Sequence, residues 1–443
     1  MLIFVLIYIV IFTAIGFYDM KRVKSFEEYA VAGKKQGTSK VLLSILATAI
    51  GASATIGIVD RTANIGFPAV WWLLVGAVGL VLQGIFLSEK VRALDADTLP
   101  DVAEKTIGAP ARKFIAAIIA VSWIGVIAAQ YVSMATVMSA VTGSENSRTI
   151  LVIVVAVTIL YSVVGGQMSV VKTDMIQAII MAAGFLLVFI YLFFVNGDVN
   201  KTVFENIELT NESFGKMGLF NLLFVVGGTY FLGPDILSRN LVSKDGKTAK
   251  KAAIFAGIAL AVFAVIIVLT GMWVISYKPQ LSGKSPLICL LDEIIPYPLA
   301  VILCLGLVST ILSSLDTCLV NVASIIEHDI LGRNKVNEVR IIVAIVGIAS
   351  LGIALFKTDI IGLLTGAYSI YAPGIVFPLF IGIICHGKRK IKRPLLYMGI
   401  VAGTVMGLLN TYMHIGGEYL PLIGMGVSLV FGILSVCIPP TKI

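Results

Sequence analysis

Four hydroxyl side chains and one carboxylate share a single apolar segment near position 315. The hydroxyls are spaced i, i+3, i+4 and i+7, which places them on one helical face, and a carboxylate lies beside them: Thr310, Ser313, Ser314, Thr317 and Asp316. An ionised Asp near mid-membrane costs about 2.5–3.5 kcal/mol, so it normally faces the protein interior and serves a function. Oxygen ligands without Cys or His suit a hard cation, which makes this segment a candidate sodium site. Alternatively, Ser and Thr bond back to their own helix and fill close helix contacts.

Composition assigns the chain to the polytopic membrane proteins. Of its 443 residues, 58% are hydrophobic and 13% are charged, and the mean hydropathy is +1.00. Apolar runs recur from end to end, and no hydrophilic stretch is long enough for a soluble domain, so we predict one transmembrane domain, 1–443, in a lipid bilayer. The net charge of +8 comes from short loops and does not indicate a nucleic-acid partner. No nucleophile elbow, HExxH motif or phosphate-binding glycine loop is present, so we predict no enzyme and no catalytic residues.

The pattern of apolar runs predicts thirteen membrane spans. They cover residues 2–18, 39–64, 68–88, 112–142, 148–164, 170–196, 215–238, 251–276, 296–326, 338–356, 358–385, 394–412 and 419–438. With this division, 26 of the 33 Lys and Arg residues fall in loops on one side, which is the cytoplasmic side by the positive-inside rule. The N-terminus is then outside and the C-terminus inside. We place the protein in a prokaryotic cytoplasmic (cell) membrane.

Two of these spans carry signals of a broken helix. The second contains Gly51 and Gly57 among many small residues, and the seventh contains Gly233 and Pro234. Interrupted spans at matching positions of two halves point to the binding site of a transporter. Each broken span is the first of a run of five spans, and an odd number of spans per run gives the two runs opposite orientations in the membrane. We therefore predict an all-α, inverted five-plus-five core. It consists of a leading helix 2–18, repeats 39–196 and 215–385, and trailing helices 394–438. The alternative is ordinary close packing and kinks.

Five stretches then carry a resemblance to a family. They are SFEEYAVAGK (25–34), TLPDVAEKTIG (98–108), YSVVGGQMSVVKTDMIQA (161–178), GGTYFLGPDILSR (227–239) and LSSLDTCLVNVASIIEHDI (312–330). In order and spacing they resemble the sodium:solute symporter family, nearest to its proline- and pantothenate-type bacterial carriers. Thr229 replaces the second glycine of the family pattern. The resemblance implies sodium symport on an amino acid–polyamine–cation-like transporter fold.

The resemblance also implies which residues bind the coupling ion, Na⁺. One site would use three carbonyls and two hydroxyls: Ala47, Ile50, Thr310, Ser313 and Ser314. A second cation site would fall on Asp174, Ser313, Asp316 and Thr317. In the second site the two carboxylates either hold a cation between them or share a proton. A structural reading of Asp174 is that it reaches water or pairs with Lys172.

The expected substrate pocket departs from known members of the family. Residues that match the proline and sugar recognition positions are absent, so neither solute carries over. Polar and aromatic side chains expected near the midplane are Ser53, Thr55, Gln130, Tyr131, Tyr230, Phe231 and Tyr368. No Arg or Lys is expected at that depth, so a substrate carboxylate would depend on half-helix N-termini and on sodium. A small amino acid-like solute is favoured.

These features predict sodium-coupled import of a small organic solute by alternating access. Proton coupling on the same scaffold, with Asp174 or Asp316 as carrier, is the first alternative. A membrane sensor without transport is the second. The residues indicate no particular oligomeric state.

Overall fold

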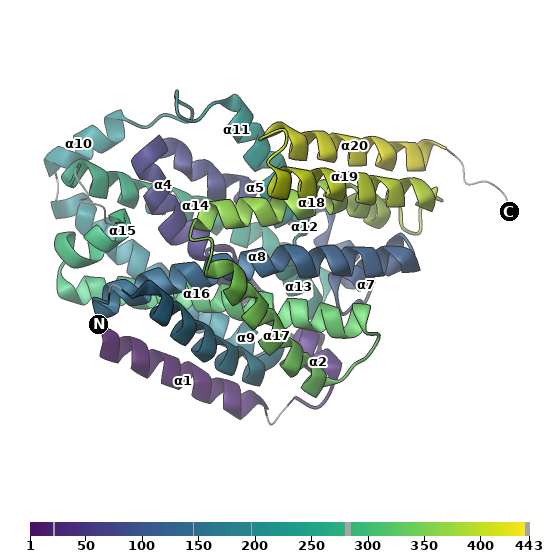
Figure 1. Ribbon diagram of the computed structural model, residues 1–443, viewed down its shortest axis with the longest axis horizontal. Coiled ribbons are helices and arrows are strands. Elements are labelled where there is room, and N and C mark those ends of the chain that lie inside the picture. The colour runs from purple at the N-terminus through teal and green to yellow at the C-terminus, as the bar shows by residue number, and fades with distance from the viewer. Residues whose placement is uncertain (21–22, 145, 196, 280–284, 439–443) are drawn as a thin grey trace.

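The computed structural model describes residues 1–443 except 21–22, 145, 196, 280–284 and 439–443, and the described chain is helical throughout apart from two isolated β-bridges (Figure 1). The helices are α1 (Leu2–Met20), α2 (Phe26–Val31), η1 (Ala32–Lys34), α3 (Thr38–Ala49), η2 (Ser53–Gly57), α4 (Ile58–Ile65), η3 (Phe67–Val70), α5 (Trp71–Phe86), α6 (Ser88–Ala93), α7 (Leu99–Thr106), α8 (Ala109–Thr142), α9 (Ser147–Val195), α10 (Gly197–Glu205), α11 (Lys216–Asn221), η4 (Leu222–Val226), α12 (Gly227–Leu232), α13 (Pro234–Val242), α14 (Gly246–Tyr277), α15 (Pro286–Cys289), η5 (Leu290–Ile294), α16 (Tyr297–Ile325), η6 (Ile326–Ile330), α17 (Val336–Ala354), α18 (Ile360–Cys385), α19 (Arg393–Met413) and α20 (Tyr419–Cys437).

Within these described ranges, 11 helices are long and apolar enough to cross a membrane, and the bent pair Thr38–Ala49 and Ser53–Ile65 makes a twelfth candidate. The count differs from thirteen because α9 runs for 49 residues through two predicted spans. One residue inside it, Gly166, is not helical (φ 67°, ψ 174°). A Cβ at this position would lie 2.7 Å from the ring of Tyr29, so only glycine satisfies both the backbone and the packing.

The first predicted break lies between α3 and η2. Helix α3 ends at Ala49, Ile50 has non-helical dihedral angles (φ −93°, ψ 66°), and the two arms meet at a bend of 59°. The chain resumes as the π-helical turn η2 and continues into α4. Small side chains in ATAIGASATIG cannot shield the backbone, and Gly51 lowers helix propensity further. The break leaves backbone groups free inside the protein, which is tolerated where they line a cavity or find partners.

The second predicted break lies between α12 and α13. Gly233 is extended (φ −72°, ψ 144°) and joins the last residue of α12 to Pro234, the first of α13. Proline has no N–H to continue α12, whereas its fixed φ suits the first position of a new helix. Both breaks therefore follow from local sequence.

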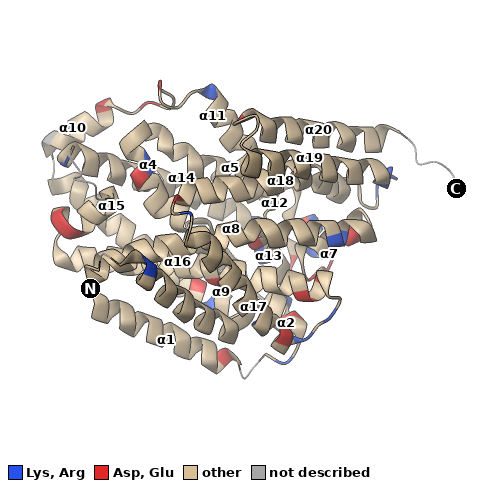
Figure 2. Cartoon of the chain, in the orientation of Figure 1, with Lys and Arg blue, Asp and Glu red and all other residues tan. Residues whose placement is uncertain are grey.

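Helix α16 forms the centre of the core. Every residue from Gly306 to Ile325 is buried, and the helix packs most extensively against α9 and also against α8 and α3. Helices α18, α19 and α20 pack on one another beside α8 (Figure 1). Charged residues gather mainly near the ends of the long helices, with a few beside α9 and α13 inside the bundle (Figure 2).

Candidate functional site

The break after α3 presents free carbonyl oxygens to α16. Ser314 donates to the Thr48 carbonyl at 3.0 Å, and Tyr230 of α12 donates to the Ala49 carbonyl at 2.9 Å. Among the described residues, no hydrogen bond is made to the carbonyl oxygens of Ala47 or Ile50. Both residues are fully buried. Buried carbonyls normally have partners, so two unpaired ones three residues apart at the break form a place for a cation.

The hydroxyls of α16 are oriented by acceptors on its neighbours. Ser313 donates to Asp174 Oδ1 at 2.6 Å, and Ser314 donates to the carbonyl oxygen of Thr48. A hydroxyl that donates in one direction keeps its lone pairs for a ligand in another. Thr310 bonds back to the Leu307 carbonyl at 2.9 Å, so its side chain is satisfied within the helix.

Asp174 forms an ion pair with Arg239 that the sequence interpretation missed. The predicted spans place Arg239 in the loop that follows residue 238, but both side chains are fully buried and their Nη2–Oδ2 distance is 2.9 Å. The same Nη2 contacts Thr48 Oγ1 at 3.0 Å and also donates to Thr317. Ser44 donates to the same carboxylate. The guanidinium thus links α13 with α3, α9 and α16.

Asp316 lies apart from this ion pair. It faces Ser162 and Tyr161 of α9, and its Oδ1 has no hydrogen-bond partner among the described residues. Lys172, one reading of the partner of Asp174, instead pairs with Asp19 of α1 at 2.6 Å. Of the four residues of the predicted second cation site, Asp174 and Thr317 contact the guanidinium of Arg239, Ser313 donates to Asp174, and Asp316 lies apart.

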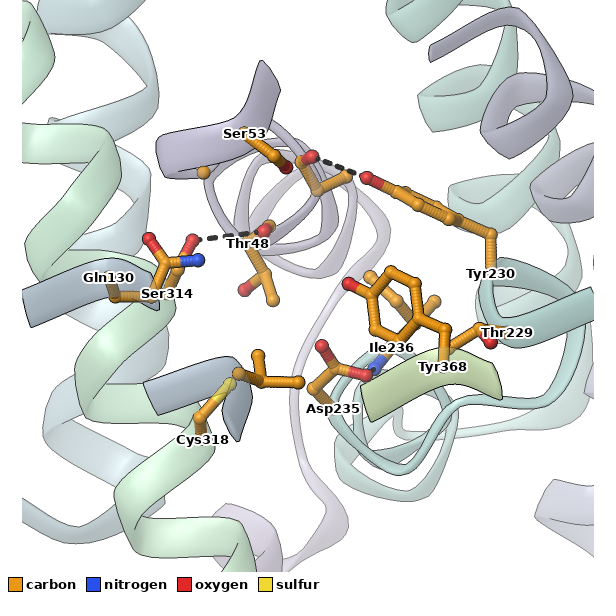
Figure 3. A pocket seen from close by; sticks show the side chains of 13 residues that line it. Thr48, Ser53, Gln130, Thr229, Tyr230, Asp235, Ile236, Ser314, Cys318 and Tyr368 are labelled. Carbon is orange, nitrogen blue, oxygen red and sulfur yellow. Dashed lines mark hydrogen bonds between the residues drawn. The ribbon is translucent and has the colours of Figure 1, made fainter. Parts of the chain in front are cut away.

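A small cavity of about 20 Å³ lies between the two breaks and α16 (Figure 3). Its walls are Thr48, Ala49, Gly51, Ser53, Val126, Gln130, Thr229, Tyr230, Asp235, Ile236, Ser314, Cys318 and Tyr368. Four of the predicted substrate residues are among them: Ser53, Gln130, Tyr230 and Tyr368. No Lys or Arg is among these wall residues.

The other three predicted substrate residues do not line this cavity. Thr55 bonds back to the carbonyls of Gly51 and Ala52 at 3.1 and 3.3 Å. Tyr131 lies against Gly347 of α17. Phe231 faces a separate apolar cavity beside Phe380, with ring centroids 5.4 Å apart.

Polar contacts hold the upper wall of the cavity in place. Gln130 accepts from the backbone N–H of Ala52 at 3.0 Å, which supplies a partner to one amide freed by the break. Ser53 accepts from the indole N–H of Trp72 at 3.2 Å. The break is therefore anchored in part by side chains from α8 and α5.

The sequence interpretation also missed Asp235, the second residue of α13. A usable signal exists, because an acidic residue directly after Gly233–Pro234 in an apolar span must begin a half-helix inside the protein. Asp at a helix N-terminus is favourable, and its Oδ1 accepts from the Ile236 N–H at 3.0 Å.

Comparison with known proteins fits this architecture. The family model described as "Sodium:solute symporter family" matches residues 29–389. The chain belongs to the sodium:solute symporter family. Among its relatives, the high-affinity proline transporter PutP of Bacillus subtilis is 25% identical over 89% of this chain and 87% of its own length. The sodium/glucose cotransporter of Vibrio parahaemolyticus is 28% identical over 63% of this chain and 56% of its own.

Solved structures share the fold of this chain over nearly its whole length. A substrate-bound, outward-open Na⁺-coupled sialic acid symporter superposes with a TM-score of 0.83 at 17% identity, and covers 99% of this chain and 98% of its own. Mhp1, a nucleobase-cation-symport-1 transporter, gives 0.66 at 14% identity over 92% and 93%. The fold is therefore that of these secondary transporters.

Proposed function

We propose that this protein is a sodium-coupled symporter that imports a small, amino acid-like solute by alternating access. The observation that carries the proposal is the pair of unpaired, buried carbonyls of Ala47 and Ile50, which lie at a helix break facing the hydroxyl face of α16. Membership of the family and the likeness to a Na⁺-coupled symporter support sodium as the ion.

The proposed sodium site consists of neutral oxygens from both sides of this break. The carbonyls of Ala47, Ile50 and Thr310 and the hydroxyls of Ser313 and Ser314 are the ligands. Neutral oxygens fit a small monovalent cation, whose charge needs no carboxylate in the inner shell to be bound reversibly. Binding would draw α3 and α16 together, because the ion needs ligands from both helices.

We propose that transport uses one sodium ion in this site and that the guanidinium of Arg239 takes the place of a second. Asp174 and Thr317 already contact that fixed positive charge, and Ser313 donates to Asp174. A mobile cation would have to displace Arg239 from a carboxylate inside the protein. The second site, with Asp316 added, then forms only in a conformation where Arg239 has moved away.

The proposed topology has thirteen spans with an external N-terminus. A continuous helix of α9's 49 residues would measure about 74 Å, more than twice the roughly 30 Å hydrocarbon core. We therefore divide α9 at Gly166 into two crossings, which gives five spans to each repeat, 39–196 and 215–385. Helix α1 begins at one end of the molecule and α20 ends at the other, which favours an odd number of crossings (Figure 1).

Thermal stability in sodium or potassium tests the proposed function directly. A ligand that binds only the folded state raises its stability by RT ln(1 + [L]/Kd). The thermal midpoint of the purified protein is expected to rise with NaCl and not with equal KCl, and to rise further when a transported solute is added. Equal midpoints in both salts, with uptake driven by a pH gradient in sodium-free medium, would instead support proton coupling.

Gly51→Ala is expected to abolish the sodium-specific rise in midpoint. A Cβ at this position would lie 2.6 Å from Ser314 Oγ and 3.0 Å from Gln130 Nε2, so one of the two must leave its place. Gly352→Ala is the matched control, because its Cβ would meet no atom within 4 Å. Alanine also has a higher helix propensity than glycine, so this substitution does not weaken α17. A normal sodium response in Gly51→Ala would place the ion elsewhere.

A further inference from the structure

The cavity between the two helix breaks contains a carboxylate that the sodium site does not use. Asp235 makes no ion pair with any described residue, although Arg239 lies one helical turn further along α13. That guanidinium is engaged with Asp174 instead. Of the two carboxylate oxygens of Asp235, Oδ1 accepts from the backbone of Ile236 and the other points into the cavity (Figure 3).

The cavity around this oxygen is built for an organic cation. Tyr368 and Tyr230 are wall residues on the same side, and no hydrogen bond of the Tyr368 hydroxyl is found among the described residues. Aromatic faces and a carboxylate together attract an alkylated or primary ammonium group. A hard metal cation would need several oxygens at once, whereas the nearby wall is completed by apolar Ile236 and by the thiol of Cys318.

The side of the cavity opposite Asp235 offers hydrogen-bond donors instead of a carboxylate. Gln130 and Ser314 lie across from Asp235 in Figure 3, next to the break at Gly51. The amide oxygen of Gln130 is used by Ala52, which leaves its N–H groups to donate. The proposed sodium ion lies on the same side. A carboxylate or hydroxyl of a solute fits there, and a positive nitrogen fits at Asp235.

We propose that Asp235 binds a positively charged nitrogen of the transported solute, which makes the substrate an amine-bearing molecule, zwitterions included. Sugars without an amine and simple carboxylic acids are then poor substrates. A carboxylate inside the membrane without a counter-charge is costly, and a bound ammonium offsets that cost by a charge-assisted hydrogen bond. This inference rests on the proposed function.

Competitive uptake into liposomes tests the inference. Full-length protein is reconstituted with potassium inside, and either NaCl or KCl outside. The external mixture holds matched pairs that differ at the nitrogen: alanine and lactate, proline and tetrahydrofuran-2-carboxylate, glucosamine and glucose. Mass spectrometry is expected to show sodium-dependent accumulation of an amine at least tenfold above its amine-free counterpart. Equal accumulation within the transported pair would overturn the inference but leave sodium symport standing.

Variants locate the effect at Asp235. Asp235→Asn is expected to raise the KM for the accumulated amine at least tenfold while keeping the sodium-specific thermal shift, and Asp235→Glu is expected to retain the preference for amines. Asp359→Asn changes another helix-terminal Asp, the exposed N-cap of α18, and is expected to behave as wild type.

An unchanged KM in Asp235→Asn overturns the inference. Loss of the sodium-specific thermal shift in that variant also overturns it, because that result would assign Asp235 to the ion. No sodium-dependent accumulation of any component overturns the proposed function, and this inference with it.

Discussion

Arg239→Gln is expected to lower the free energy of unfolding by about 3–5 kcal/mol, because it leaves the carboxylate of Asp174 buried without its counter-charge. The double variant Asp174→Asn/Arg239→Gln is expected to recover most of this loss, since it removes both charges together. Thermal unfolding in detergent, followed for the single and double variants side by side, measures the difference. A double variant no more stable than Arg239→Gln would show that the pair is not the cause.

An exposed ion pair supplies the matched control for Arg239. Arg333 and Glu338 are 2.7 Å apart on the surface, with over half of the Arg333 side chain exposed. Arg333→Gln is expected to lower the free energy of unfolding by less than about 1 kcal/mol, because water screens the charges and solvates the residue left behind.

Where Arg239→Gln folds, its sodium activation curve reports on the second cation site. We expect it to become steeper than wild type, since a sodium ion can then take the place of the guanidinium beside Asp174.

Ser313→Ala and Ser314→Ala are each expected to raise the sodium concentration for half-activation about tenfold or more, which equals about 1.4 kcal/mol of lost binding. Each substitution removes one of five proposed ligand oxygens, and the other ligands cannot close around the gap without moving helices. Solute affinity at saturating sodium is expected to change far less. The measurement is sodium-dependent uptake, or the sodium-dependent thermal shift, over a concentration series.

The same helix offers a matched serine as control. Ser324 is buried on α16, three turns beyond the site, and its hydroxyl has no hydrogen-bond partner among the described residues. Ser324→Ala is expected to leave the sodium response unchanged. A normal half-activation in both Ser313→Ala and Ser314→Ala would contradict the assignment of the site to this face of α16.

Local patterns were sufficient to predict most of the helices and both breaks. Apolar length predicts a span, and Gly233–Pro234 ends a helix wherever it occurs, because these properties depend on a few neighbouring residues. The continuity of α9 was harder to predict. Gly166 was predicted to lie in a loop, yet its neighbours remain helical on both sides, so the residue interrupts a long helix at one point.

The partner of a buried charge could not be predicted in this way. Arg239 follows an apolar span and looks like a loop residue, and Asp174 is 65 positions earlier in the chain. Only the packing of both α13 and α9 against α3 and α16 brings them together. The same limit explains the substrate residues, because the direction of a side chain next to a break depends on local backbone bonds. Thr55 satisfies itself on its own helix, whereas Ser53, two residues earlier, faces the cavity.

The hydrogen bond from Tyr230 to the Ala49 carbonyl joins the two broken helices at one point. Ala49 lies between the proposed sodium carbonyls of Ala47 and Ile50, and the ring of Tyr230 is part of the wall around the solute. When bound sodium has already ordered this break, solute binding no longer carries the free-energy cost of ordering it. Thermodynamic linkage makes the exchange symmetric: the factor by which sodium tightens solute binding equals the factor by which solute tightens sodium binding.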